Sequence, residues 1–157
     1  MNHTALGEGR EFDRVRAIAR VLGDRAVGLG DDCALVAPGQ GRLAVSTDVS
    51  VEAVHFRLEW IGHEEVGWRA AAAALSDLAA EGAEPAGLLA ALVVPGSATD
   101  EQVTALMTGV GAAADSVGAP VIGGDLASGP FWSIAATVLG WTTRPVGRNG
   151  ARPGDAL

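Results

Sequence analysis

Aspartates follow small residues at three places where an apolar run of the sequence ends. They lie in the segments 28–32 (GLGDD), 46–48 (STD) and 123–125 (GGD). Carboxylate and hydroxyl oxygens are the ligands that Mg2+ prefers, and glycines let backbone N–H groups approach a phosphate closely. A fourth aspartate, Asp77, lies among alanines in an apolar helical stretch, where an unpaired carboxylate is costly. The four sites together favour a multi-metal phosphate site over four independent turns.

Each of these sites also has an ordinary structural explanation. The Ser-Thr-Asp segment is equally typical of a turn or a helix N-cap, and each Gly-Asp segment of a tight turn. Asp77 needs no ligand if its helical stripe faces water and the alanines only supply helix propensity. One carboxylate of the pair Asp31 and Asp32 could simply be solvated. Taken alone, His55 is typical of a packed edge residue and Arg148 of a solvated loop charge.

The composition restricts how the chain could bind a phosphate ligand. The 157 residues carry a formal net charge of −8 and contain no lysine, so every basic side chain is an arginine. A lysine-based nucleotide motif is therefore excluded, and metal ions, arginines or backbone N–H groups must offset the phosphate charge. No nucleic acid is expected as a partner, because its phosphates require a basic surface. Cys33, the single cysteine, lies in an apolar run and is predicted to be a core residue.

The sequence also indicates where the protein resides. No apolar run reaches the roughly 18 residues needed to span a bilayer. The segment Met1–Arg10 lacks the apolar region of a signal peptide. We therefore expect a soluble cytoplasmic protein with no membrane partner.

Apolar periodicity predicts the elements that would position the aspartates. The predicted order is helix 11–22, strands 26–29, 33–37 and 43–48, helix 63–82, strand 86–94, helix 99–118, and strands 121–122 and 132–141. This order indicates an α/β or α+β domain that has a mixed sheet with helices on one face. It places the Ser-Thr-Asp and Gly-Gly-Asp segments at strand ends, where ligands gather in such folds. The 132–141 strand is apolar on both faces and is expected to be an exposed edge that pairs with a second copy.

Six segments with these features occur together and in a fixed order. They are 28–35 (GLGDDCAL), 45–48 (VSTD), 55–56 (HF), 75–85 (LSDLAAEGAEP), 122–125 (IGGD) and 148–155 (RNGARPGD). With them the chain resembles the thiamine-monophosphate kinase family over nearly its whole length. The wider superfamily includes aminoimidazole ribonucleotide synthetase, selenophosphate synthetase and the hydrogenase-maturation dehydratase, which share the Gly-Asp-Asp and Gly-Gly-Asp elements. The Ser-Thr-Asp, His-Phe and Leu-Ser-Asp-Leu-Ala-Ala segments are the ones that indicate the kinase.

The resemblance implies an activity, a set of ligands and a fold similar to the N-terminal domain of aminoimidazole ribonucleotide synthetase. The implied reaction transfers the γ-phosphoryl group of ATP to thiamine phosphate, giving thiamine diphosphate, in a homodimer that uses several Mg2+ ions. The implied magnesium ligands are Asp32, Ser46, Thr47, Asp48, Asp77 and Asp125. The implied ATP contacts are Gly124, Asp125 and Arg148, and the implied contact to thiamine phosphate is His55. No covalent nucleophile is required, because an oxygen of the acceptor phosphate can attack the phosphoryl group directly.

The chain departs from the family pattern at two places. Ala74 stands where the family often has asparagine, and residues 126–128 (LAS) stand where it often has Thr-Thr-Arg, so one phosphate contact that the family arginine could make is left unassigned in this chain. The resemblance divides the chain into a metal-binding, ATP-binding and dimerisation domain (1–150) and the start of a missing C-terminal domain (151–157). Two alternatives stay open. One is another enzyme of the superfamily, such as the hydrogenase-maturation dehydratase, and the other is a non-catalytic fragment that binds nucleotide or dimerises.

Overall fold

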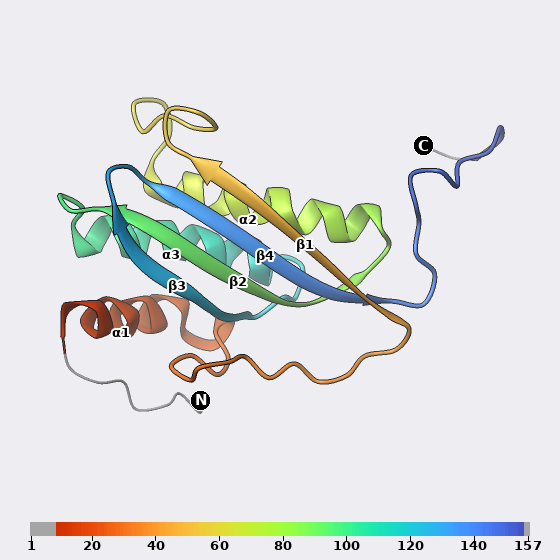
Figure 1. Cartoon of the computed structure of the whole chain (residues 1–157), viewed down its shortest axis with the longest axis horizontal. Coiled ribbons are helices and arrows are strands. Elements are labelled where there is room, and N and C mark those ends of the chain that lie inside the picture. Colours follow the sequence, from red (N-terminus) through yellow and green to blue (C-terminus); the bar gives the residue numbers. More distant parts are fainter. Residues whose placement is uncertain (1–8, 156–157) are drawn as a thin grey trace.

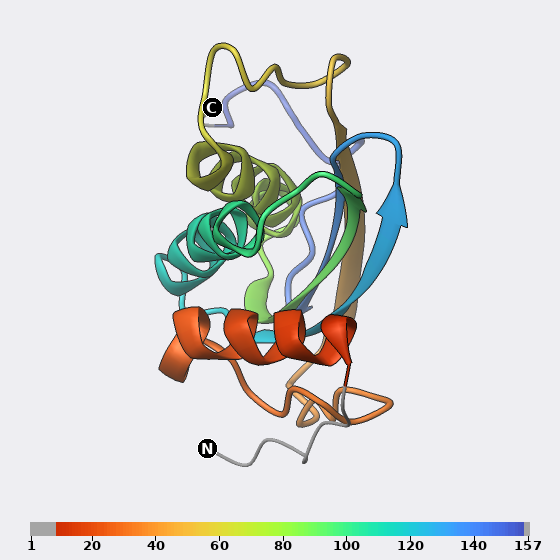
Figure 2. The same ribbon diagram turned by 90° about the vertical axis from the view of Figure 1, so that its left-hand side faces the viewer.

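Helices cover only one face of a four-stranded sheet in the computed structural model, which describes residues 9–155 (Figure 1). In chain order the elements are α1 (Arg10–Leu22), the 3-10 helix η1 (Gly23–Arg25), β1 (Arg42–Val51), α2 (His63–Ala80), β2 (Glu84–Pro95), α3 (Asp100–Asp115), β3 (Val121–Gly129) and β4 (Ser133–Thr142). The strands lie in the order β1-β4-β2-β3, and only the β2–β3 pair is parallel. Figure 2 shows α2 and α3 side by side on one face of the sheet, with α1 next to α3 and extending towards the edge of the sheet. The predicted mixed sheet with helices on one face is confirmed.

The segment between α1 and β1 differs from the prediction. The predicted strand 26–29 is reduced to one bridge from Ala26 to β3, and the predicted strand 33–37 has no strand pairing. Because this segment runs outside the sheet, Cys33 is exposed, and its predicted place in the core is wrong. At the other end, residues 151–155 contain a turn and no strand, and residues 156–157 lie outside the described range.

Two strands differ from the prediction in length, and β4 differs in position. β1 continues to Val51 and β3 to Gly129, so Asp48 and the Gly-Gly-Asp segment lie within strands and not at strand ends. Apolar periodicity did not predict these continuations, because they contain polar residues, and edge strands tolerate polar side chains that face water. β4 was predicted to be an edge, but it pairs with β1 on one side and β2 on the other. Its two apolar faces reflect this central position, and the edges of the sheet are β1 and β3.

The core lies between the sheet and the layer formed by α2 and α3. Alternate residues of β2 face the helices and are buried: Leu88, Ala90, Leu92 and Val94. On the other face of the sheet, which no helix covers among residues 9–155, β1 exposes three apolar side chains. Leu43, Val45 and Val49 are 47%, 59% and 50% exposed. No helix in the described part of the chain combines the length and apolarity needed to cross a bilayer.

α2 and α3 pack with their backbones in close contact, and two buried glycines permit this approach. A Cβ atom built on Gly67 would lie 1.9 Å from the Leu106 carbonyl oxygen. A Cβ atom built on Gly109 would lie 1.9 Å from the Glu64 carbonyl oxygen. Since interiors are packed to near-crystalline density, a larger residue at either position must push the two helices apart.

α1 is fastened to the start of α3 by a buried arginine. Arg14 is 8% exposed. Its Nε atom donates to Asp100 Oδ1 at 2.9 Å, and its Nη2 atom donates to the Ala98 carbonyl oxygen at 2.8 Å. Because a buried guanidinium without acceptors is costly, these two bonds hold α1 against the start of α3.

His63 begins α2 and packs against Trp132, with ring centroids 4.8 Å apart and the ring planes inclined at 68°. Its Nε2 atom is buried and has no hydrogen-bond partner among the described residues. Burial lowers the pKa of His63 below its usual 6.5, and the nearby Glu52 carboxylate offsets only part of that effect. Because the unfolded chain then binds a proton to this ring more readily than the folded chain, protonation favours unfolding.

We expect Gly109→Ala to lower the free energy of unfolding by about 1–3 kcal/mol, because the helices must separate. The expected loss occurs although alanine is by itself the better helix former by about 1 kcal/mol. Gly96→Ala is the matched control, since a Cβ atom there meets nothing within 4 Å, and it should change stability by less than about 0.5 kcal/mol. Urea unfolding followed by circular dichroism measures both variants. Equal midpoints would show that the spacing of α2 and α3 does not depend on Gly109.

We expect the stability that a neutral His63 preserves to be complete above the unfolded pKa of about 6.5 and to decline as the pH falls below it. His63→Gln removes the titrating ring. The drop in thermal midpoint between about pH 7.5 and about pH 5.5 should therefore be smaller in this variant than in the unmodified chain. Differential scanning calorimetry at the two pH values measures the drop, and the same drop in both proteins would contradict the assignment.

Candidate functional site

Ser46 and Asp77 come from different elements and are in direct contact. Ser46 Oγ donates to Asp77 Oδ2 at 2.5 Å, which joins β1 to α2. Both residues are half-buried, so the carboxylate that stands among alanines has a polar partner. The contact arises because α2 packs across β1 and β4. Two oxygen donors thus converge, as a hard cation such as Mg2+ requires.

This pair lines a cavity of about 700 Å3 between β1, the C-terminal half of α2 and the segment after β4. Arg148 lines the same cavity, together with the carboxylates of Glu81 and Asp155. The structure therefore brings the predicted ATP contact Arg148 to the predicted metal ligands Ser46 and Asp77. A guanidinium beside carboxylates can hold the phosphates of a ligand whose counter-cation binds to those carboxylates.

Asp48 lies two residues further along β1 and lines a second cavity, of about 210 Å3, with His55. His55 is in the loop between β1 and α2. Val51 N donates to His55 Nδ1 at 3.1 Å. In the neutral ring the proton is then on Nε2, so His55 offers a hydrogen-bond donor at that atom.

Thr47 lies on the opposite side of β1 from Ser46 and Asp48. Successive side chains of a strand point to opposite faces, so these three neighbours cannot all face one ion directly. Thr47 Oγ1 is exposed and lies 2.9 Å from Thr137 Oγ1 on β4, on the open face of the sheet. The structure therefore separates Thr47 from the other predicted ligands of β1.

Asp32, Gly124 and Asp125 gather at the other edge of the sheet. They line a cavity of about 450 Å3 between α1, the segment 28–34 and β3. A Cβ atom built on Gly124 would lie 1.9 Å from the Ala90 carbonyl oxygen, so the close approach of β2 already requires glycine there. The structural explanation of this glycine and its predicted role at a phosphate are compatible.

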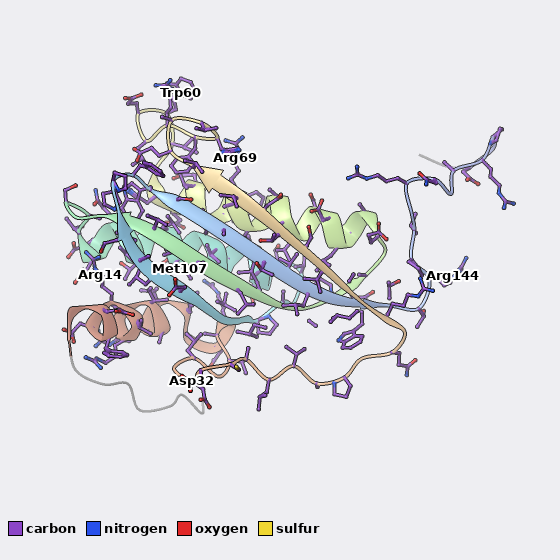
Figure 3. All side chains as sticks on the ribbon, viewed as in Figure 1. Arg14, Asp32, Trp60, Arg69, Met107 and Arg144 are labelled. Atoms are coloured by element: carbon purple, nitrogen blue, oxygen red, sulfur yellow. The ribbon has the colours of Figure 1, made fainter. Side chains whose placement is uncertain are left out.

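The two groups of predicted ligands are far apart in one chain. One row of paired residues crosses all four strands: Asp48, Ala136, Ala90 and Gly124. Three strand spacings separate the ends of this row by roughly 14 Å. Figure 3 shows Asp32 on the opposite side of the molecule from Arg69 and the β1–α2 loop. Within residues 9–155, no group of three or more His, Cys, Asp or Glu side chains is arranged to hold a metal ion. One copy of the chain thus assembles parts of the predicted site and not the whole.

Arg69 and Glu81 are two of the charged residues that line these cavities and were not among the predicted site residues. Arg69 lies beside His55 and Asp48, and Glu81 lies beside Asp77. Arg69 is the only arginine in α2, which is a signal that the sequence did contain. Glu81 follows Asp77 by four residues, the spacing that places two side chains on one helix face, but only the position of β1 shows that this face borders a cavity.

Several known proteins are similar to this chain. The model of the family described as AIR synthase related protein, N-terminal domain, matches residues 30–142. Thiamine-monophosphate kinase of Mycobacterium tuberculosis (strain ATCC 25618 / H37Rv) is 37% identical over 154 residues, which are 97% of this chain and 46% of that protein. The solved structure of AaThiL complexed with AMPPCP and TMP has a TM-score of 0.69 and 29% identity, covering 94% of this chain and 48% of that chain. Hydrogenase maturation protein HypE in complex with ATP has a TM-score of 0.77 at 22% identity, covering 95% of this chain and 46% of that one, which shows the fold alone.

These likenesses agree with a mixed sheet that carries helices on one face. The chain belongs to the AIR synthase related protein family, as its N-terminal domain. The curated relatives found at 32–42% identity are thiamine-monophosphate kinases. The chain spans about half the length of the curated relatives it matches.

Proposed function

We propose that this chain forms the metal- and ATP-binding part of a thiamine-monophosphate kinase. The observation that carries the proposal is the contact between Ser46 and Asp77 at a cavity that Arg148 also lines. Relatives named thiamine-monophosphate kinase align with up to 97% of the chain, and the similar AaThiL was solved with AMPPCP and TMP. The proposal includes Mg2+ as the metal and a cytoplasmic location.

The residues would divide the tasks of a phosphoryl transfer. Asp77 and Asp48 would hold Mg2+, which when bound supplies neutralisation of the phosphate charge. Arg148 would contact the ATP phosphates, a task that falls to arginine because the chain has no lysine. His55 would donate to the phosphate of thiamine phosphate. An oxygen of that phosphate forms the new bond to the γ-phosphorus while the bond to the bridging oxygen breaks and ADP leaves.

A homodimer would bring the two separated groups of ligands together. Among the described residues, the outer edges of β1 and β3 have no pairing strand, and the sheet face opposite the helices exposes apolar side chains. A two-fold related copy whose β3 lies beside β1 would place the partner subunit's Asp125 near Thr47 and Asp48. The pairing would also cover the open face, which supports a homodimer as the functional unit.

We expect Asp77→Ala to weaken Mg2+-dependent ATP binding by more than about tenfold, because the variant loses a metal ligand. The fold should survive, since Asp77 is only half-buried and its loss leaves little empty volume. Asp24→Ala, an exposed carboxylate in η1, is the matched control and should bind like the unmodified chain. Titration calorimetry with and without Mg2+ measures the affinities for ATP. Unchanged ATP affinity in Asp77→Ala would contradict the assignment of Asp77 as a magnesium ligand.

A thermal-shift assay of the unmodified chain distinguishes the rival functions. A rise in thermal midpoint with ATP and Mg2+ that increases when thiamine phosphate is added supports the kinase. A rise that thiamine phosphate leaves unchanged favours another enzyme of the superfamily or a non-catalytic fragment that binds nucleotide. The absence of any rise favours a fragment that only dimerises.

We expect light scattering at micromolar concentration to give twice the mass of one chain. Val45→Glu should shift the protein towards the monomer, because it buries a charge in the proposed interface. Val117→Glu is the control, since Val117 is similarly exposed (46%, against 59% for Val45) but follows α3, away from the open face of the sheet. A monomeric mass for the unmodified chain, or equal effects of the two substitutions, would count against this interface.

A further inference from the structure

The loop between β1 and α2 folds tightly around His55. His55 N donates to the Val51 carbonyl oxygen at 2.8 Å, and Val51 N donates back to the ring. Ala53 has a φ of 64°, a left-handed conformation that is strained for a residue other than glycine. Phe56 is 5% exposed and anchors the loop in the core. The ring of His55 is therefore held with Nδ1 occupied and with Nε2–H as its donor.

Arg69 on α2 reaches the same loop. Its Nη1 atom donates to the His55 carbonyl oxygen at 2.9 Å. Figure 3 shows Arg69 at the base of the loop that carries Trp60. The bond uses one of the five N–H donors of the guanidinium, and none of the ion pairs found among residues 9–155 involves Arg69. In a chain with a net charge of −8, an arginine without an acidic partner is suited to bind an anion.

Arg69 and His55 line one cavity, of about 210 Å3, whose other walls include Asp48, Phe56 and Val66. This volume is below the roughly 300–1,000 Å3 of sites that enclose a drug-sized ligand. It suits one functional group of a larger molecule instead. The two donors match phosphoryl oxygens, and Asp48 would repel a phosphate unless a cation lay between them. A phosphoryl group that shares a cation with Asp48 satisfies all three side chains.

We propose that Arg69 binds the phosphate of the acceptor substrate. Its guanidinium and His55 Nε2–H form a two-donor subsite for the terminal phosphoryl group of a phosphate monoester. The bond from Arg69 to the His55 carbonyl also positions the loop, so that both donors reach the same group. The identity of the ester, thiamine phosphate, rests on the proposed function, whereas the subsite itself rests on this geometry.

The test compares thiamine phosphate with thiamine, which lacks the phosphate, by NMR titration of the 157-residue chain with Mg2+ present. We expect Arg69→Gln to weaken binding of thiamine phosphate about tenfold or more and to leave the weaker binding of thiamine unchanged. Arg69→Lys keeps the charge but not the planar fork, so it should recover part of the loss. Arg20→Gln, exposed on α1, is the matched control and should bind both ligands like the unmodified chain.

Each outcome decides between the subsite, a structural role and the proposed function. Equal weakening of both ligands by Arg69→Gln, with a lower thermal midpoint, would mean that Arg69 only holds the loop and would overturn the inference. Unchanged affinity for thiamine phosphate in Arg69→Gln also overturns it and leaves the kinase proposal intact. Ribose 5-phosphate, a phosphate monoester without the thiamine group, is titrated in the same way. If it binds as tightly as thiamine phosphate, and Arg69→Gln weakens the binding of both esters, the subsite stands and the kinase proposal fails. Failure of the unmodified chain to bind either ester overturns the subsite, and the ATP titration of Asp77→Ala then judges the kinase separately.

Discussion

The close contact between α2 and α3 at Gly67 and Gly109 is the constraint on which the rest of the structure depends. Two helices can share one face of a four-stranded sheet only if their axes lie close together, and this contact sets how far α2 extends over β4 and β1. The position of α2 in turn decides which side chains meet. Asp77 reaches Ser46 on β1, and Arg69 reaches the loop that follows β1. Because these two residues are eight positions apart on one helix, α2 fixes their spacing at about 12 Å along its axis.

The sequence predicted the helices and the fold class well, because apolar periodicity reports directly which face of an element is buried. The sequence-based prediction of strands was wrong where a segment buries only one face or none. The run 33–37 is apolar but lies outside the sheet, and β3 continues through Gly-Gly-Asp because an edge strand needs few apolar residues. Strand order was also beyond reach, since the same two apolar faces in β4 fit an edge that pairs with another chain or a central strand. Only long-range pairing decides between them.

The candidate site was predicted as a set of residue types, and the structure shows how alternation divides that set. Ser46 and Asp48 point towards α2, and Thr47 between them points to the open face. A local motif that predicts three adjacent ligands therefore places two of these side chains on one side of the sheet and the third on the other. The sequence motifs supplied the candidate donors, but the distance between β1 and β3 across the sheet depends on topology. Arg69 was not predicted either, because the sequence does not show that its side chain contacts the loop around His55.

The hydrogen bonds between Val51 and His55 have a consequence for strand register. Val51 lies at the end of an edge strand, and its N–H and carbonyl groups are both engaged by the chain's own loop. Edge strands normally offer such groups to any incoming strand. A strand that adds to β1 must therefore end its ladder before Val51, since no free donor or acceptor continues it there. The loop between β1 and α2 thus limits which alignments of a neighbouring strand along β1 can form.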